Sequence, residues 1–279
     1  MATIGQAQLS STHKSNSASV PTQPSELVLK DGAIKAAYQR GMAHAFGSTA
    51  DRDYASAAED LRPAATAGLA EAELALGYLY DNGFGVQQDY RLAMSYYRAA
   101  ADQRNAKAAN NIGALYEWGH GVSVNFKEAA RWYRIAAELG DPTGQMNLGG
   151  LYFYGKGVRR DYGQAVYLLR KAAPHGLVPA ELALANLYLL GKGVPKDYSE
   201  AARWTRRAAE QGDAHAQAEL AYLYEQGKGV PLDYITAYRL YQRSIQGGVE
   251  ESKSRIKNLL QIMTPGQIKE ANTLDPRME

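Results

Sequence analysis

The chain has 279 residues, of which 46% are hydrophobic and 22% charged, a composition typical of a soluble folded protein rather than a disordered one. Its 31 basic and 29 acidic residues leave a net charge of +2, which does not indicate a nucleic acid or an anionic membrane as the main partner. The chain contains no cysteine, which excludes a disulfide framework, a thiolate metal site and a cysteine nucleophile. This length predicts one or two compact domains or one elongated array of repeats.

The first 25 residues are rich in Ser, Thr, Gln and Asn and contain Pro21 and Pro24, so we expect residues 1–30 to form a disordered tail. They lack the charged start and apolar stretch of a secretory leader. This favours a cytoplasmic location, and export stays open if a longer precursor was trimmed. No run of 18 apolar residues follows, so we expect no insertion into a membrane.

A motif with a period of 36 residues organises the rest of the chain. The sequence Gly-x-Gly-Val begins at five evenly spaced glycines: Gly83, Gly119, Gly155, Gly191 and Gly227. Three residues beyond each Val, an Asp or Asn precedes an aromatic residue. One period earlier stand Gly47 and Asp53-Tyr54, where Thr49 and Ala50 replace the second Gly and the Val. An incomplete first unit is expected of a terminal repeat.

Each unit contains two predicted helices, A and B. Helix A carries an apolar stripe such as Leu76, Leu79 and Tyr80, and it ends at the first Gly, which can adopt the left-handed conformation. Helix B begins at the Asp or Asn and carries an alanine in every unit. We predict capping boxes at three helices B, with the pairs Asn125 and Glu128, Asp161 and Gln164, and Asp197 and Glu200.

These units predict an all-α protein, a right-handed α-solenoid of helix-turn-helix repeats. Six 36-residue units and a half-unit would occupy residues 31–262. Residues 263–279 would form a capping helix and tail, since Thr264, Pro265 and Gln267 have capping-box spacing. Ile268, Ala271 and Leu274 would face inward.

The A-helix pattern A-x-x-x-L-G-x-L-Y, followed by G-x-G-V, D-Y and a B-helix ending in an aromatic residue, x, Arg, x and Ala-Ala, resembles Sel1-like repeats, which are relatives of tetratricopeptide repeats. The resemblance covers roughly residues 35 to 260. It implies an adaptor or scaffold module of signalling, protein quality control or bacterial envelope and host-interaction systems. A cysteine-rich branch of this family has been linked to β-lactam or peptidoglycan-like ligands, and this chain departs from that branch in lacking cysteine.

Positions that recur in every unit are interpreted as framework, whereas variable positions on one face of helix A are candidates for binding. The framework includes one arginine in each helix B, expected to pair locally: Arg62, Arg98, Arg134, Arg170 and Arg206. If helix A lines the concave side, its variable face forms a groove for a peptide or protein segment. The predicted contacts are Tyr78, Asn82, Asn111, Trp118, Asn147, Tyr154, Asn186, Glu219 and Tyr222. The alternative is that Trp118, Tyr154 and Leu190 pack against the next unit.

No catalytic or cofactor site emerges from the motifs. The segment from Gly150 to Lys156 imitates a phosphate-binding loop, but Gly157 stands where Ser or Thr is needed and the same Gly-Lys-Gly recurs twice. The five histidines lack metal-ligand spacing, and His44 occupies a column that holds tyrosine elsewhere. We therefore expect neither an enzyme nor a bound cofactor or metal.

The sequence thus favours a non-enzymatic adaptor with a protein or peptide partner. The alternative is a protein that binds or hydrolyses peptidoglycan or β-lactams, as the cysteine-rich branch implies. A third hypothesis is self-association through an unmatched terminal unit. Nucleic-acid binding would require a basic groove, and the variable face is nearly neutral.

Overall fold

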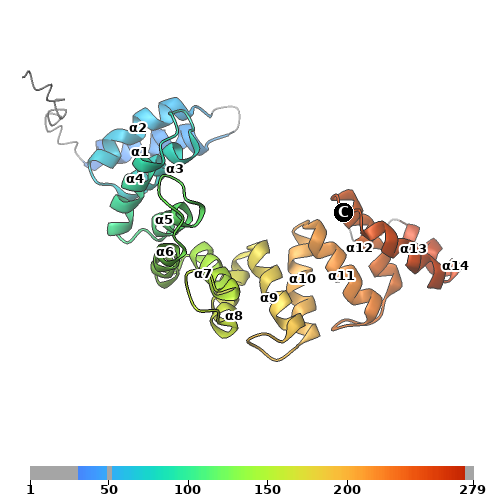
Figure 1. Ribbon diagram of the computed structural model, residues 1–279. Helices are drawn as coiled ribbons and strands as arrows, with labels where there is room; N and C mark the ends of the chain where they lie inside the picture. Colours follow the sequence, from blue (N-terminus) through green and yellow to red (C-terminus); the bar gives the residue numbers. More distant parts are fainter. Residues whose placement is uncertain (1–30, 49–51, 274–279) are drawn as a thin grey trace, which may run out of the picture.

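The structure, a computed structural model, describes residues 31–48 and 52–273. All regular structure in these residues is helical, as the sequence predicts, and from α1 to α13 each helix packs against the next. Figure 1 shows the helices as an open, curved row with α1 near one end and α14 at the other, an α-solenoid. The helices A are α1 (Asp31–Phe46), α3 (Ala70–Asn82), α5 (Ala106–Trp118), α7 (Pro142–Tyr154), α9 (Val178–Leu190) and α11 (Ala214–Gln226).

The helices B alternate with these, and two further helices close the row. The helices B are α2 (Tyr54–Thr66), α4 (Tyr90–Asp102), α6 (Phe126–Glu138), α8 (Tyr162–Ala172), α10 (Tyr198–Glu210) and α12 (Tyr234–Gln246). They are followed by α13 (Ser252–Ile262) and α14 (Pro265–Asn272). The predicted tail at residues 1–30 lies outside the described residues.

The ends of the helices follow the repeated motif. The first Gly of each Gly-x-Gly-Val caps a helix A with φ between 60° and 74°, which confirms its predicted left-handed conformation. The Asp or Asn before each helix B accepts hydrogen bonds from amides of the first turn. All three predicted capping boxes are only half formed, because the caps Asn125, Asp161 and Asp197 accept from first-turn amides without a returning hydrogen bond. The backbone amide of each cap residue donates instead to a tyrosine carbonyl of the preceding helix A, as in Asn125 to Tyr116 at 2.8 Å. Glu128 and Glu200 receive hydrogen bonds from Arg131 and Arg203.

A second glycine fixes how the units stack, and we call this contact the unit seam. A Cβ on Gly85, Gly157 or Gly229 would collide with the backbone at the start of the preceding helix B, for instance with Phe126 in the case of Gly157. Within the same loops, the residue between the two glycines lies on the aromatic ring that opens that helix. The loop of one unit is therefore seated on helix B of the unit before it.

Hydrogen bonds repeat along the solenoid at the same spacing. Each arginine of the B-helix column donates to the tyrosine hydroxyl of the next helix A, as in Arg98 to Tyr116 at 3.1 Å and Arg206 to Tyr224 at 3.0 Å. The same bond joins Arg62, Arg134 and Arg170 to their tyrosines. The expected local pairing of the five arginines is confirmed.

Two interior positions, one on helix A and one on helix B, change together from one unit to another. Tyr133 donates to Glu117 at 2.7 Å, and the corresponding bonds join Tyr97 to Asp81 and Tyr241 to Glu225. In two other units neither member of the pair is an acid or a tyrosine: Phe153 with Leu169, and Leu189 with Thr205. Burial, followed by the hydrogen bond to Glu117, raises the pKa of Tyr133. The neutral phenol is therefore the donor.

The junction between α8 and α9 departs from the pattern. Helix α8 has 11 residues where α6 has 13, because Pro174 cannot donate the next helical hydrogen bond, and a 3-10 turn covers Ala173–His175. Arg207 of α10 reaches back to the carbonyl of Pro174 at 3.3 Å and to the fully buried Glu181 at 2.9 Å. This arginine ties three successive helices together where the helix is interrupted.

The last two helices cover the end of the row. The capping box of Thr264 and Gln267 is present, and Ala271 is buried against α12, as predicted. Ile268 is partly buried in the same cluster. Leu274 lies outside the described residues.

Candidate protein-binding face

Large apolar side chains are exposed at the final residue of four of the helices A. They are Phe46 at 48% exposure, Trp118 at 69%, Tyr154 at 67% and Leu190 at 51%, and Tyr78 lies exposed one turn before the same position. We call these five side chains the apolar ridge. Their exposure does not fit the alternative in which Trp118, Tyr154 and Leu190 pack against the next unit.

A groove of about 1010 Å³ crosses the A helices of the first units. Its lining moves from Met42 and Phe46 near the end of α1, through Leu74 and Tyr78 of α3, to residues at the beginning of α5 and α7. The groove thus runs diagonally across successive units. Of the predicted contacts, Tyr78 and Asn111 line it.

Side-chain amides join α5 to α7, and two of them line this groove, those of Asn110 and Asn111. Asn147 donates to Asn110 at 2.9 Å, and Asn110 donates to Asn111 at 3.4 Å. Asn110 was not among the predicted contacts. At the equivalent position the other units carry aromatic or apolar residues, namely Tyr38, Leu74, Met146, Leu182 and Ala218. The departure from this repeated pattern was the sequence signal that could have identified Asn110.

The other predicted contacts are not gathered in one place. Asn82 is exposed and donates to the carbonyl of Tyr78 in its own helix at 2.9 Å, and Asn186 is exposed on α9. Glu219 and Tyr222 are half-buried on α11.

Tyr222 has one neighbour in the loop after its own helix and one in α13. It accepts a hydrogen bond from Lys228 at 3.2 Å, and the guanidinium of Arg255 lies 5.0 Å from its ring. The second contact joins Tyr222 to the first of the two terminal helices.

Four charged residues line the groove, two cations and two acids: Arg104, Lys107, Glu71 and Asp141. Asp141 is buried at the start of α7, where its carboxylate accepts from the amide of Gly144 at 2.6 Å. Burial raises the pKa of Asp141 and outweighs that hydrogen bond and the charge of Lys107, which both lower it. This carboxylate serves as the N-cap of α7.

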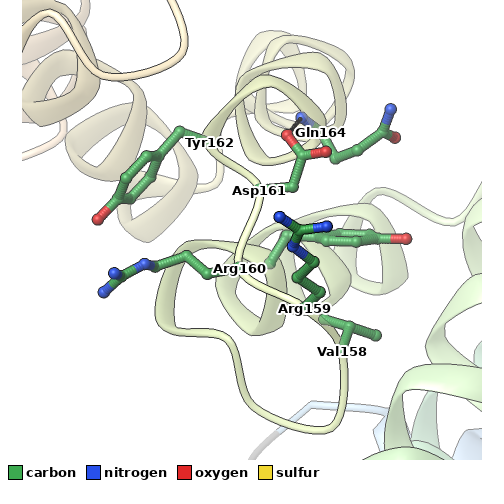
Figure 2. Close-up of a pocket in the computed structure, with 7 residues that line it drawn as sticks. Val158, Arg159, Arg160, Asp161, Tyr162 and Gln164 are labelled. Atoms are coloured by element: carbon green, nitrogen blue, oxygen red, sulfur yellow. Dashed lines mark hydrogen bonds between the residues drawn. The ribbon is translucent and has the colours of Figure 1, made fainter.

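A second hollow, in the loop between α7 and α8, belongs to the framework. Figure 2 shows Arg159, Arg160 and Tyr162 around it, with Asp161 turned toward Gln164. The carboxylate of Asp161 accepts a hydrogen bond from the backbone amide of Gln164 at 3.0 Å. An equivalent hollow lies beside Asp89, two units earlier. Because this feature repeats with the loop, we do not interpret it as a site for one ligand.

Neither a spanning helix nor a cluster of metal-ligating side chains occurs in residues 31–48 and 52–273. No helix there is long and apolar enough to cross a bilayer. No group of three His, Asp or Glu side chains there could hold a metal ion.

The stacked helix pairs, the unit seam and the exposed A-helix face define a helical-repeat protein. The family model of the Sel1 repeat matches residues 34–69, 70–105, 106–141, 142–176, 178–213 and 214–249. The chain therefore belongs to the Sel1 repeat family. A gap in the match, between 176 and 178, coincides with the interrupted junction after α8.

Solved structures of bacterial proteins share this fold. The chain is similar to c5321, described as a protective antigen of uropathogenic Escherichia coli, with 35% identity and a TM-score of 0.77 over 86% of this chain. It spans only 52% of that protein. A Sel1 repeat protein from Oxalobacter formigenes is 31% identical, with a TM-score of 0.71 over 86% of this chain and 98% of the other.

A third structure, the immunity protein PA5088 from Pseudomonas aeruginosa, is 20% identical, with a TM-score of 0.50 over 89% of this chain and 90% of its own, and shows the fold alone. A comparison with curated proteins returns no match. Sel1 repeat proteins are generally non-catalytic scaffolds for protein–protein interaction.

Proposed function

We propose that this protein is a non-enzymatic adaptor that docks an extended segment of a partner protein across the face formed by its helices A. The observation that carries the proposal is the apolar ridge, five exposed side chains at or near the ends of consecutive helices A. Exposed apolar groups cost free energy in water and are typical of surfaces that a partner covers.

The groove beside the ridge supports the same function. Tyrosine and tryptophan supply large contact areas with few rotatable bonds, and they contribute most to binding at the centres of protein interfaces. The amides of Asn110 and Asn111 could hydrogen-bond the backbone of a bound segment. Nothing in the described residues favours the peptidoglycan or β-lactam alternative.

The test is crosslinking capture from the native organism with the double variant Trp118→Ala and Tyr154→Ala. We expect capture of the partner to fall by at least about ten-fold, which corresponds to losing about 1.4 kcal/mol of binding. The melting temperature should stay within about 2 °C of the wild type, because both side chains are exposed.

Tyr167→Ala is the matched control, since Tyr167 is 54% exposed but lies on α8, a helix B. It should leave capture unchanged. Equal capture by the wild type and the double variant, or an equal loss with Tyr167→Ala, would show that the A-helix face is not the docking surface.

A further inference from the structure

The turn between α4 and α5 contains an unusual backbone conformation. Arg104 has a φ of 65°, and it is the one residue other than glycine with a positive φ among the described residues. The corresponding position is glycine in the other units, with φ between 78° and 97°: Gly68, Gly140, Gly176, Gly212 and Gly248. A side chain is disfavoured in this conformation, so the arginine is retained at a cost to the stability of its turn.

The turn itself has the geometry of its neighbours. The amide of Arg104 donates to Ala101 at 2.8 Å, as that of Gly140 donates to Ala137 at 3.1 Å. The arginine therefore contributes nothing to the turn that glycine does not supply. What it adds is a guanidinium, and this guanidinium lines the groove of about 1010 Å³.

A second cation of the lining lies three residues further along the chain. Lys107, one residue into α5, lines the same groove, and within the described residues neither Arg104 nor Lys107 makes an ion pair or hydrogen bond with a side chain. The nearby carboxylate of Asp141 is buried and caps α7. Glu71, on α3, is the other acid of the lining and also makes no ion pair in these residues.

The lining has two chemically distinct parts. Tyr38, Met42 and Phe46 form an apolar part on α1, whereas Arg104 and Lys107 lie with the asparagines at the start of α5. An extended segment that crosses the groove would place an apolar side chain at the first part and an anionic one at the second. Arginine and lysine bind carboxylates through charge-assisted hydrogen bonds, which are stronger than neutral ones.

We propose that Arg104 and Lys107 form a subsite that receives an aspartate or glutamate side chain of the docked segment. The inference rests on the proposed function, of which it names the partner chemistry: an acidic extended peptide with an apolar residue nearby.

The experiment measures binding of short fluorescein-labelled peptide pools, random in Tyr, Leu, Gly and Ser except for fixed positions that hold Glu, Gln, Lys or phosphoserine. The wild type should bind the Glu pool at least about ten-fold more tightly than the Gln pool, the difference expected of one charge-assisted bond. Arg104→Gly should remove that preference and at the same time raise the melting temperature by about 2 °C, because the left-handed strain is relieved.

Two variants complete the design. Lys107→Gln should weaken binding of the Glu pool without changing the melting temperature. Gly212→Arg places an arginine in the same turn three units further on, beyond the groove, where a Cβ would meet nothing within 4 Å. It should lower the melting temperature and leave the binding of the Glu pool unchanged.

Several outcomes would overturn the subsite. They are equal binding of the Glu and Gln pools, tighter binding of the Lys or phosphoserine pool, absence of binding to every pool, and a Glu preference that survives Arg104→Gly. The proposed function stands or falls separately, on whether the double variant Trp118→Ala and Tyr154→Ala lowers partner capture by at least about ten-fold.

Discussion

The unit seam is built from positions that stay the same from unit to unit, whereas the groove is built from positions that differ between units. At the seam, the same contact recurs from unit to unit: a glycine loop seated on the first turn of the preceding helix B. In the groove, α1, α3 and α5 contribute different side chains at equivalent positions, as in Met42, Tyr78 and the column of Asn110. At the seam a Cβ on the second glycine would collide with its neighbours, whereas equivalent positions of the groove carry side chains of different size and polarity.

This contrast separates structural from functional residues within one chain. A residue that recurs at the seam is explained by packing, and a residue that departs from its column needs another explanation. Arg104 departs at the cost of backbone strain, and Asn110 departs by placing an amide where other units are apolar. Both departures fall in the lining of one groove.

The largest expected effect comes from breaking the seam with Gly157→Ala. The new Cβ would collide with the backbone of Phe126 at a φ of 68°, so left-handed strain and overpacking should together destabilise the protein by about 3 kcal/mol. Thermal unfolding followed by circular dichroism measures this loss. Gly212→Ala is the matched control, because it has a φ of 88° but open space around it.

The control should cost only about 1 kcal/mol. Equal losses in the two variants would show that backbone conformation, rather than the close approach of loop and helix, explains the second glycine of the motif.

The constant positions made the fold predictable from the sequence. A period of 36 residues located the six units, and glycine and aspartate marked where the helices end, as at Gly119 and Asp89. The half-formed capping boxes at Glu128 and Glu200 show the limit of this reasoning. A local motif identifies the side chains that can reach a cap, but the backbone amide of the cap residue already donates to a tyrosine carbonyl of the preceding helix A.

The groove was less predictable for a geometric reason. The sequence places residues on a face of one helix, but the rotation between units decides which part of each face lines a groove. Tyr78 and Asn111 therefore share the groove, while Glu219, equivalent to Asn111 in its unit, lies far along the row. The strain at Arg104 was detectable only by comparing its position with the glycine of the other units.

A smaller effect is expected inside the units, where correlated pairs can be exchanged. Tyr133→Phe leaves the half-buried Glu117 without its hydrogen bond and should cost about 1 to 2 kcal/mol. Adding Glu117→Leu removes the unpaired carboxylate, so the double variant should recover most of that loss, as the apolar pair of Phe153 and Leu169 suggests. A double-mutant cycle from chemical denaturation measures the coupling.

Tyr167→Phe controls for the loss of a hydroxyl, because Tyr167 is exposed, and it should change stability by less than about 0.5 kcal/mol. Additive losses for Tyr133 and Glu117 would contradict the pairing.

The smallest effect concerns a carboxylate on the variable face of α11. Burial raises the pKa of Glu219 above its ordinary value of 4.5, and among the described residues its side chain makes no hydrogen bond. An acid whose pKa is higher in the folded state favours folding at low pH, and this contribution is lost as the pH rises through the folded pKa. At neutral pH the ionised Glu219 therefore opposes folding.

Glu219→Gln should raise stability at pH 7 by less than about 1 kcal/mol, and the gain should vanish below about pH 4. Denaturation at a series of pH values measures both. Asp233→Asn is a control of opposite sign, because Asp233 caps α12 with two backbone amides and its charge favours the helix N-terminus. If Glu219→Gln were instead destabilising at pH 7, the ionised carboxylate would have to be stabilised where it lies, and position 219 would belong to the framework rather than to the variable face.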